Sequence, residues 1–507
     1  MSDTGAPEAL EGLEAAFWEY ERALMANDLP ALDALFAPGP QTLRDDAAGI
    51  LVGHDAISDF RKGRGGAPKR TVLHVEFRRI ADAAALVIAI TEPATGGRGQ
   101  QTQVWVLADG AWRVSAAHVS LPTPAVNGTV WRTVGTPLMR GASAGPLSGE
   151  TVAVKDLYDV QGHRVGAGIP AYLAEAAPAD GTSPAVAALL AAGADLTGIA
   201  QTDEFAYSIA GRNPHYGTPP NPAVLGGVPG GSSSGPASAV ALGQASIGLG
   251  TDTAGSIRVP ASYQGLWGLR TTHGAVSAHR LLPLAPTFDT VGWLTRSASA
   301  LRAAADATLD ATTQVAVDPS FVVDPALLEH CEPDVRAAFE AFGAFDAVDL
   351  GDIDELFQTF RTVQAAEAWA THGEWIRAHP GALGDDVEAR FAFAATITPS
   401  AEAAGRVALA AARNRLNAVL GDRVLLLPSA SSTAPSVFAD ADLIERTRQG
   451  TLRLTCIAGI TGRPALSVPL LGVPQRGALL PAPLGLCLVG PRFGELALID
   501  LGASLSG

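Results

Sequence analysis

The spacing of apolar residues in the first part of this 507-residue chain predicts helices followed by strands. Between residues 10 and 36, large apolar side chains recur at steps of three and four, as in helices with one buried face. Four strand-like segments follow, beginning at Thr71, Ala84, Gln101 and Trp112. Apolar and polar residues alternate in the first and third of these segments, which predicts a sheet with one buried face. The Ala-Asp-Gly turn at 108–110 predicts a hairpin connection. Residues 1–125 are therefore predicted to form a small α+β domain.

The pattern changes after this domain. Residues 126–150 are rich in Pro, Gly, Ser and Thr, and this composition predicts a linker. Over residues 151–507, short apolar runs alternate with Ala-rich helical stretches, and helices dominate 325–422. This α/β pattern is too long for a single mononucleotide-binding unit.

Composition and charge exclude several classes of function. Thirty-five basic against 51 acidic residues give a net charge of −16, which argues against nucleic-acid binding, because phosphate contacts need clustered Lys and Arg. No apolar run approaches the roughly 18 residues that a spanning helix needs, so we expect no membrane association. The acidic N-terminal segment has no apolar core and does not resemble a signal peptide. Three widely spaced cysteines give neither a disulfide framework nor a zinc motif. These features predict a soluble cytoplasmic enzyme.

The use of lysine is the first chemical signal. The chain contains only three lysines, Lys62, Lys69 and Lys155, and every other basic residue apart from histidine is arginine. Lys155 ends an apolar run, TVAVK. Lysine can lose its proton when it is desolvated, whereas arginine cannot. Lys155 is therefore either a lysine extending from a strand end to solvent or a neutral general base, with its pKa lowered from about 10.4 to near 7.

Two Gly/Ser-rich segments are the second signal. PGGSSSG at 229–235 contains a G-x-S-x-G motif with Ser233 at the nucleophile position, but loop residues precede it where the motif requires a buried strand. The alternative is a flexible turn. In residues 247–270, an apolar strand leads into small residues and then Ser256, an arrangement that leaves backbone N–H groups free to form an oxyanion hole. The alternative there is a Gly-rich loop.

Taken together, these segments resemble the amidase signature family of serine hydrolases over roughly residues 135–505. The resemblance runs from VAVKDLYDVQGH through TDEFAYSIAGRNPHYGTPPNP, PGGSSSG and GTDTAGSIRVPASYQGLWGLRTTHGAVS to FDTVGWLTR. The sequence of these motifs is most similar to that of indole-3-acetamide amidases, and allophanate hydrolases share the DTAGS variant. The resemblance implies an α/β amidase signature fold, in which helices surround a mixed central sheet.

The resemblance also implies roles for individual residues. Ser256 matches the nucleophile, Ser232 matches a bridging serine preceded by a cis peptide bond, and Lys155 matches the base. Lys155 would take a proton from Ser232, which would take one from Ser256 as that hydroxyl attacks the amide. The oxyanion would be bound by the backbone N–H groups of Thr253, Ala254, Gly255 and Ser256.

One residue in this motif departs from the common pattern. Many relatives have Gly-Gly-Ser where this chain has Ala254–Gly255–Ser256. Alanine keeps its N–H but restricts φ, so we interpret the change as one of geometry or specificity.

The neighbours of the triad are assigned supporting roles. Asp252 is expected to fix the Ser232 loop, and Ser233 to assist it by hydrogen bonding. Arg258 either pairs with Asp252 or meets a substrate carboxylate. Substrate contacts are expected from loops around 204–216 and from the helices of 325–440.

Within those two regions, Tyr207 and Trp369 are predicted pocket walls.

The N-terminal domain resembles the cone-shaped α+β fold of the ketosteroid isomerase and nuclear transport factor type. It is similar, more narrowly, to small proteins and domains found beside amidases in triazine-ring breakdown. Four polar residues either line a pocket of this domain or belong to its core and rim: Tyr20, Arg44, His74 and His118. Because cone domains commonly pair through their sheets, a homodimer is expected.

The predicted function is hydrolysis of a small carboxamide to a carboxylate and ammonia through an acyl-enzyme. Neither a metal nor an organic cofactor is expected, and the expected partner is a small-molecule amide. The alternatives are a urea-type amidohydrolase acting on biuret- or allophanate-like compounds, an ammonia-donating amidotransferase subunit, and a non-catalytic binding module.

Overall fold

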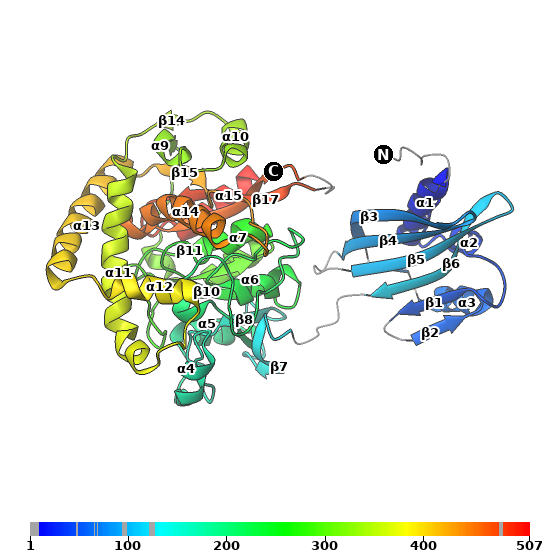
Figure 1. Cartoon of the computed structure of the whole chain (residues 1–507), viewed down its shortest axis with the longest axis horizontal. Coiled ribbons are helices and arrows are strands. Elements are labelled where there is room, and N and C mark those ends of the chain that lie inside the picture. Colours follow the sequence, from blue (N-terminus) through cyan, green and yellow to red (C-terminus); the bar gives the residue numbers. More distant parts are fainter. Residues whose placement is uncertain are drawn as a thin grey trace. The chain divides into compact units, whose positions relative to one another are not determined.

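The computed structural model describes residues 10–46, 49–64, 66–67, 69–93, 99–120, 127–475 and 480–506 (Figure 1). The chain divides into two compact units, the first made chiefly of Met1–Ala125 and the second chiefly of the residues from Val126 onward.

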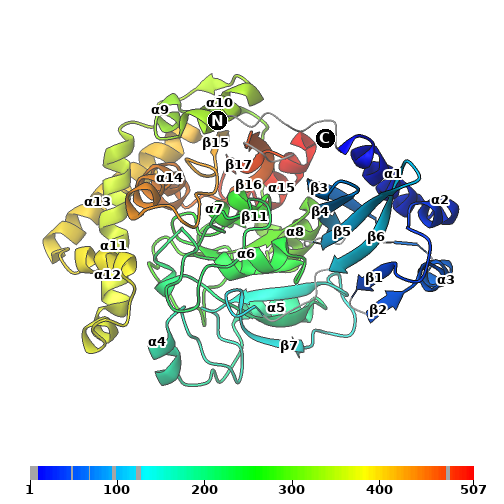
Figure 2. The ribbon, with the colours of Figure 1, turned by 45° about the vertical axis from the view of Figure 1, so that its right-hand side comes forward.

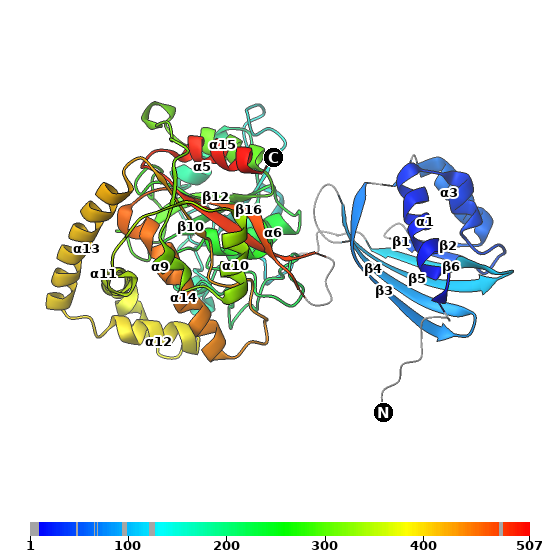
Figure 3. The same cartoon turned by 90° about the horizontal axis from the view of Figure 1, so that it is seen from above.

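The first unit combines helices with one curved sheet. The helices are α1 (Leu13–Ala26), α2 (Leu29–Ala34) and α3 (His54–Arg64). The strands are β1 (Leu43–Asp46), β2 (Gly49–Val52), β3 (Arg70–Ala81), β4 (Ala84–Pro93), β5 (Gly99–Ala108) and β6 (Ala111–Ser120). Among the described residues the sheet order is β2-β1-β6-β5-β4-β3, and every pairing is antiparallel except that of β1 with β6. Helices α1 and α3 lie on the same face of this sheet (Figure 3).

The structure confirms the α+β prediction for this unit. All four predicted strands are present, and Ala108 pairs with Ala111 across a two-residue turn. Asp109 and Gly110 adopt φ values of 52° and 74°, the left-handed conformations that favour Asp-Gly in such a hairpin. The sequence analysis did not predict β1, β2 and α3. The two strands are four residues each and pair with each other, and β1 joins the sheet by pairing with β6, a long-range contact that local periodicity does not show.

The second unit is built on a large mixed sheet. Its described strands are ordered β14-β13-β15-β17-β16-β11-β12-β10-β8-β9-β7. They are β7 (Trp131–Met139), β8 (Thr151–Lys155), β9 (Asp195–Ala200), β10 (Ile247–Asp252), β11 (Trp267–Arg270), β12 (Thr290–Thr295), β13 (Phe321–Val323), β14 (Asp346–Ala347), β15 (Val424–Pro428), β16 (Ala465–Val473) and β17 (Ala482–Val489). Strand β10 is parallel to β8 and antiparallel to β12.

Helices surround this sheet. They are α4 (Pro170–Glu175), α5 (Pro184–Ala191), α6 (Ser234–Ala241), α7 (Arg258–Gln264), α8 (Ala298–Asp306), α9 (Pro325–Leu328), α10 (Pro333–Phe342), α11 (Ile353–Ala378), α12 (Asp385–Ala394), α13 (Pro399–Leu420), α14 (Ala441–Thr461) and α15 (Glu495–Leu505). Helices α8 and α15 pack together, and so do α11, α12 and α13, which form one side of the unit (Figure 2). The predicted α/β architecture, a mixed sheet surrounded by helices, is confirmed.

Part of the predicted linker is wrong. Trp131–Met139 forms β7, which is hydrogen-bonded to β9 and belongs to the large sheet. Gly135 and a cis-proline at Pro137 interrupt its pattern, as is tolerated at an edge strand with a neighbour on one side only.

Within the described residues, no helix is both long and apolar enough to cross a membrane.

Candidate active site

Lys155 lies at the end of β8 and is fully buried. Its Nζ is 2.8 Å from Oγ of Ser232, 3.0 Å from Oγ of Ser233 and 2.7 Å from Oγ1 of Thr251. Burial lowers the pKa of Lys155 to about 7, against a smaller opposing effect of nearby aspartates. The lysine therefore does not extend to solvent, and both of its protonation states are accessible near neutral pH.

The PGGSSSG segment is a buried turn that leads directly into α6. Its flexible-turn interpretation is wrong, because Ser232 and Ser233 have no exposed surface. The Gly231–Ser232 peptide bond is cis. The Gly231 N–H donates to the carbonyl of Ile209 (2.8 Å), and Thr202 Oγ1 donates to the carbonyl of Ser232 (2.9 Å).

Ser256 follows β10 and faces this turn. Its carbonyl accepts a hydrogen bond of 3.2 Å from the Ser233 N–H, which brings the two loops together. Of the three serines, Ser256 retains 3% exposure whereas Ser232 and Ser233 have none. Among the described residues its hydroxyl has no hydrogen-bond partner. Ser256 is therefore the serine best placed to be reached by a small molecule.

The loop before Ser256 supplies fewer free N–H groups than expected. The Gly255 N–H donates to Oδ1 of Asp252 at 2.8 Å and is not available to an oxyanion. The N–H groups of Thr253, Ala254 and Ser256 make no hydrogen bond within the described residues. The expected set of four is thus corrected to three.

Asp252 holds the Ser256 loop, not the Ser232 loop as expected. Its carboxylate accepts hydrogen bonds from the N–H groups of Gly255 and Ile257, and it pairs with Arg258 (2.8 Å) and Arg270 (3.2 Å). Burial alone would raise the pKa of Asp252, but the two guanidinium groups outweigh it and hold the pKa well below its usual range. Since Arg258 is fully buried in this pair, it does not reach a substrate carboxylate.

Asp203 performs the role that was expected of Asp252. Its carboxylate accepts hydrogen bonds from the Gly211 N–H (2.9 Å) and from the Ser234 hydroxyl (3.1 Å). A Cβ on Gly231 would lie 2.3 Å from Oδ2 of Asp203, so only glycine fits there. The sequence analysis quoted the segment that begins TDEF, in which Asp203 stands, but gave Asp203 no role, because its contact with the serine turn joins residues that are remote along the chain.

Three further missed residues position the site. Thr251 contacts the lysine, as described above. Asp289 accepts a hydrogen bond of 2.6 Å from the Thr253 hydroxyl, and Thr455 Oγ1 on α14 donates to the carbonyl of Ala254 at 2.7 Å. These contacts come from β10, from the residue that precedes β12 and from α14, and only the folded chain reveals them.

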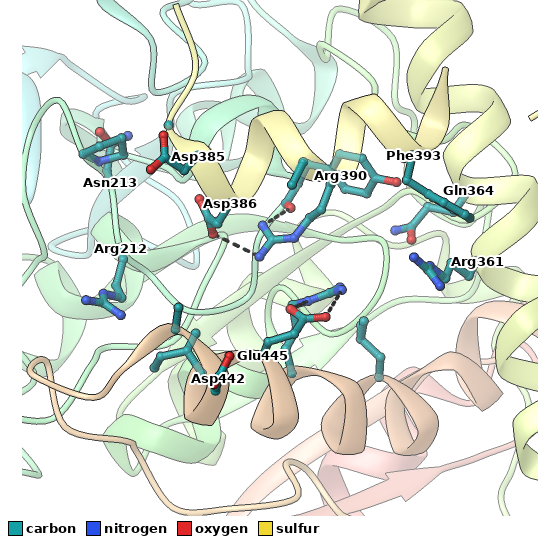
Figure 4. A pocket seen from close by; sticks show the side chains of 18 of the residues that line it. Arg212, Asn213, Arg361, Gln364, Asp385, Asp386, Arg390, Phe393, Asp442 and Glu445 are labelled. Atoms are coloured by element: carbon teal, nitrogen blue, oxygen red, sulfur yellow. Dashed lines mark hydrogen bonds and ion pairs between the residues drawn. The ribbon is translucent and has the colours of Figure 1, made fainter. Parts of the chain in front are cut away.

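A cavity of about 810 Å³ lies in the second unit (Figure 4), and Lys155, Ser232 and Ser256 are not among its lining residues. Tyr207 lines it, as predicted, together with residues of α11, α12 and α14. Trp369 is not among the lining residues; its ring packs against Gly373 and Arg377 of its own helix. The role of Trp369 as a pocket wall therefore stays a prediction. The cavity is also lined by residues between 441 and 452, which lie outside the regions 204–216 and 325–440 where substrate contacts were expected.

The polar residues predicted in the first unit separate into two groups. Tyr20 and Arg44 are buried, and Arg44 Nη2 lies 2.8 Å from Oδ2 of Asp46. His74 and His118 have exposed side chains, and each contacts a surface carboxylate. The histidines are therefore rim residues. Within the described residues, no cluster of three or more His, Cys, Asp or Glu side chains is placed to bind a metal ion.

Comparisons with known proteins agree with the geometry of the site. The sequence profile of the family described as Amidase matches residues 135–342, and that described as AtzH-like matches residues 2–124. A solved structure described as "Crystal structure of amidase" superposes with a TM-score of 0.64 at 30% identity, covering 71% of this chain and 85% of that one. The chain belongs to the amidase family.

Two curated relatives match about a third of the chain. Amidase 1 of Oryza sativa subsp. japonica is 50% identical over 180 residues, which are 36% of this chain and 41% of the relative. The 1-carboxybiuret hydrolase subunit AtzE of Pseudomonas sp. (strain ADP) is 42% identical over 174 residues, which are 33% and 36%. The chain thus spans about two fifths of the length of the curated relatives it matches.

Proposed function

We propose that the protein hydrolyses the C–N bond of a small amide to a carboxylate and ammonia, with Ser256 as nucleophile, Ser232 as bridging group and Lys155 as base. The observation that carries this proposal is the buried contact of 2.8 Å between Lys155 and Ser232, together with the lowering of the Lys155 pKa to about 7. A lysine of this pKa is about half neutral at pH 7, and its neutral form accepts a proton.

The reaction follows from this arrangement. Neutral Lys155 accepts the proton of Ser232, which in turn accepts that of Ser256 as its Oγ attacks the amide carbon. The free N–H groups of Thr253, Ala254 and Ser256 stabilise the oxyanion, and one such donor is worth about 10²–10³ in kcat. The proton then returns through Ser232 to the departing ammonia. Water, deprotonated by the same route, cleaves the acyl-enzyme.

A second candidate substrate class is a carboxylated urea. The AtzH-like match over residues 2–124 and the similarity to a 1-carboxybiuret hydrolase subunit favour this class. In the first unit, Arg44 Nη1 and Gln103 Nε2 are buried and lack a hydrogen-bond partner among the described residues. This unit therefore has unused polar groups with which to bind a small polar molecule.

The test is ammonia release from purified protein and from two serine variants. The amides are aryl and alkyl amides, malonamate, biuret and carboxylated ureas. Ser256→Ala should lose at least about 10⁴-fold in kcat, because the nucleophile is gone. Ser233→Ala removes one hydrogen bond to Lys155 and should lose only about 10–100-fold.

The proposal is refuted if Ser256→Ala retains the wild-type rate. If Ser233→Ala is inactive and Ser256→Ala is active, the nucleophile is instead Ser233 of the G-x-S-x-G motif. As a control, circular dichroism of both variants should match that of the wild type.

A further inference from the structure

The cavity contains polar side chains that the protein itself leaves unpaired. Arg361 and Gln364, one turn apart on α11, both line it. Neither makes a hydrogen bond or an ion pair with any described residue, although Gln364 is only 6% exposed. Arg361 contacts only the ring of Phe393, with its guanidinium carbon 3.9 Å from the ring centroid. No interaction is drawn from either side chain in Figure 4. The nearly buried Gln364 amide and the Arg361 guanidinium lack hydrogen-bond partners, which points to a ligand that supplies such partners.

Four arginines and four acids line the cavity, and the acids are the more exposed of the two: Arg212, Arg361, Arg390 and Arg448 against Asp385, Asp386, Asp442 and Glu445. The side chains of Arg390 and Arg448 are 10% and 13% exposed. Their carboxylate partners, Asp386 and Glu445, are 51% and 48% exposed and lie toward solvent. The acids therefore neutralise the outer parts of these pairs, while Arg361 makes no ion pair with a described residue, although Glu445 lies within electrostatic range of it.

Three of the arginines that line the cavity lie near Tyr207. Burial raises the pKa of Tyr207, and Arg448, Arg390 and Arg361 each act against this rise, so all three guanidinium groups lie within electrostatic range of the ring. The Tyr207 hydroxyl has no hydrogen-bond partner among the described residues. The rest of the wall combines apolar residues, among them Phe357 and Phe393, with polar ones such as Asn213 and Thr218.

The cavity shares its walls with the elements that hold the serines. Tyr207 is two residues from Ile209, whose carbonyl binds the N–H of Gly231 next to Ser232. On α14, Leu452 lines the cavity one turn before Thr455, which donates to the Ala254 carbonyl. A smaller cavity lined by Ile209 and Tyr263 shares Arg448 with it. A ligand in the cavity therefore contacts the segments that hold the Ser232 and Ser256 loops, although neither serine lines the cavity.

We propose that the cavity selects amides that carry a second, anionic group, a carboxylate, which Arg361 binds together with the Gln364 amide. This inference rests on the proposed function, because it names the substrate class of the same site. A guanidinium binds a carboxylate through two parallel N–H donors, and the apolar walls fit a hydrocarbon body between the carboxylate and the amide.

The test compares amides of similar shape and different charge. 4-Carbamoylbenzoate is anionic, 4-methylbenzamide is neutral and 4-(aminomethyl)benzamide is cationic; succinamate and butyramide form an aliphatic pair. Wild type should prefer the anionic member by at least about tenfold in kcat/KM, as expected of a charged hydrogen bond. Arg361→Gln should abolish that preference by lowering kcat/KM for the anionic amide at least about tenfold. Arg361→Lys should restore part of it, because the charge remains but the paired donors do not.

The control is Arg377→Gln, on the same helix but not lining the cavity, which should keep the preference. Binding to the Ser256→Ala variant, measured by calorimetry, gives a readout that needs no turnover: the affinity for 4-carbamoylbenzoate should fall at least about tenfold when Arg361→Gln is added.

Three outcomes overturn the inference: a wild type without preference for the anionic amide, a preference that survives Arg361→Gln, or no binding of either anionic amide to the Ser256→Ala variant. If neutral amides are hydrolysed in a Ser256-dependent manner without charge preference, the proposed function stands and this inference fails. If activity persists in Ser256→Ala, the proposed function fails.

Discussion

Polar side chains in the loops around Ser256 are paired with one another, whereas two polar side chains on the wall of the cavity are not. Around Ser256, Asp252 is saturated by two arginines and by backbone N–H groups, and Lys155 contacts three hydroxyls. On the cavity wall, Arg361 and Gln364 have no partner among the described residues. A saturated network fixes atoms in place, whereas unpaired groups are available to a ligand. The paired network therefore positions the catalytic groups, whereas the unpaired groups on the cavity wall recognise the ligand.

Lys155→Arg should give the largest effect. Arginine keeps the charge but cannot act as a base, so kcat should fall by at least about 10³-fold. The measurement is ammonia release. Lys62→Arg is the control, because Lys62 is an exposed lysine paired with Asp59 and should behave as wild type. Substantial activity in Lys155→Arg would contradict the proton relay.

Asp252→Asn should cause a large loss of stability. It leaves Arg258 and Arg270 buried without a charge partner, which costs about 3–5 kcal/mol. The measurement is the denaturant midpoint of unfolding. Asp354→Asn breaks an ion pair whose acid is 62% exposed and should cost less than about 1 kcal/mol. Equal losses in the two variants would argue that the network around Asp252 does not position Ser256.

The pH dependence should report on Lys155. Its pKa of about 7 means that it is protonated, and unable to accept a proton, at lower pH. We expect kcat/KM to fall about tenfold per pH unit below pH 7 and to level off above it. Rates that remain constant between pH 5.5 and 8, in protein that stays folded, would exclude Lys155 as the titrating base.

Glu445→Gln should give the smallest effect and tests the cavity. Removing this partly exposed acid frees Arg448, so KM for 4-carbamoylbenzoate should decrease by about two- to fivefold, the value of an exposed ion pair. Glu340→Gln breaks a similar helical pair that does not line the cavity and should leave KM unchanged. An increase in KM would mean that Arg448 and its acid bind the substrate as a unit.

Local sequence was sufficient for much of the fold and for the residues with the strongest chemistry. Apolar periodicity predicted the four long strands of the first unit, because each has its own pattern. The scarcity of lysine singled out Lys155, and its motif with Ser232 and Ser256 indicated the amidase family, which the comparisons confirm. The homodimer, the cytoplasmic location and the substrate stay predictions.

Only the tertiary structure decided which groups are paired and which are free. Asp252 and Asp203 are both aspartates near small residues, and sequence gave no means of telling which one holds which loop. The Gly255 N–H is occupied because Asp252 lies 2.8 Å away, a relation fixed by the turn geometry. Arg361 is one of many arginines in the sequence, and it becomes distinctive because the packing of α11, α12 and α14 leaves it without an ion pair among the described residues. Residue types and their order follow from sequence, whereas pairing depends on distances between segments that are remote along the chain.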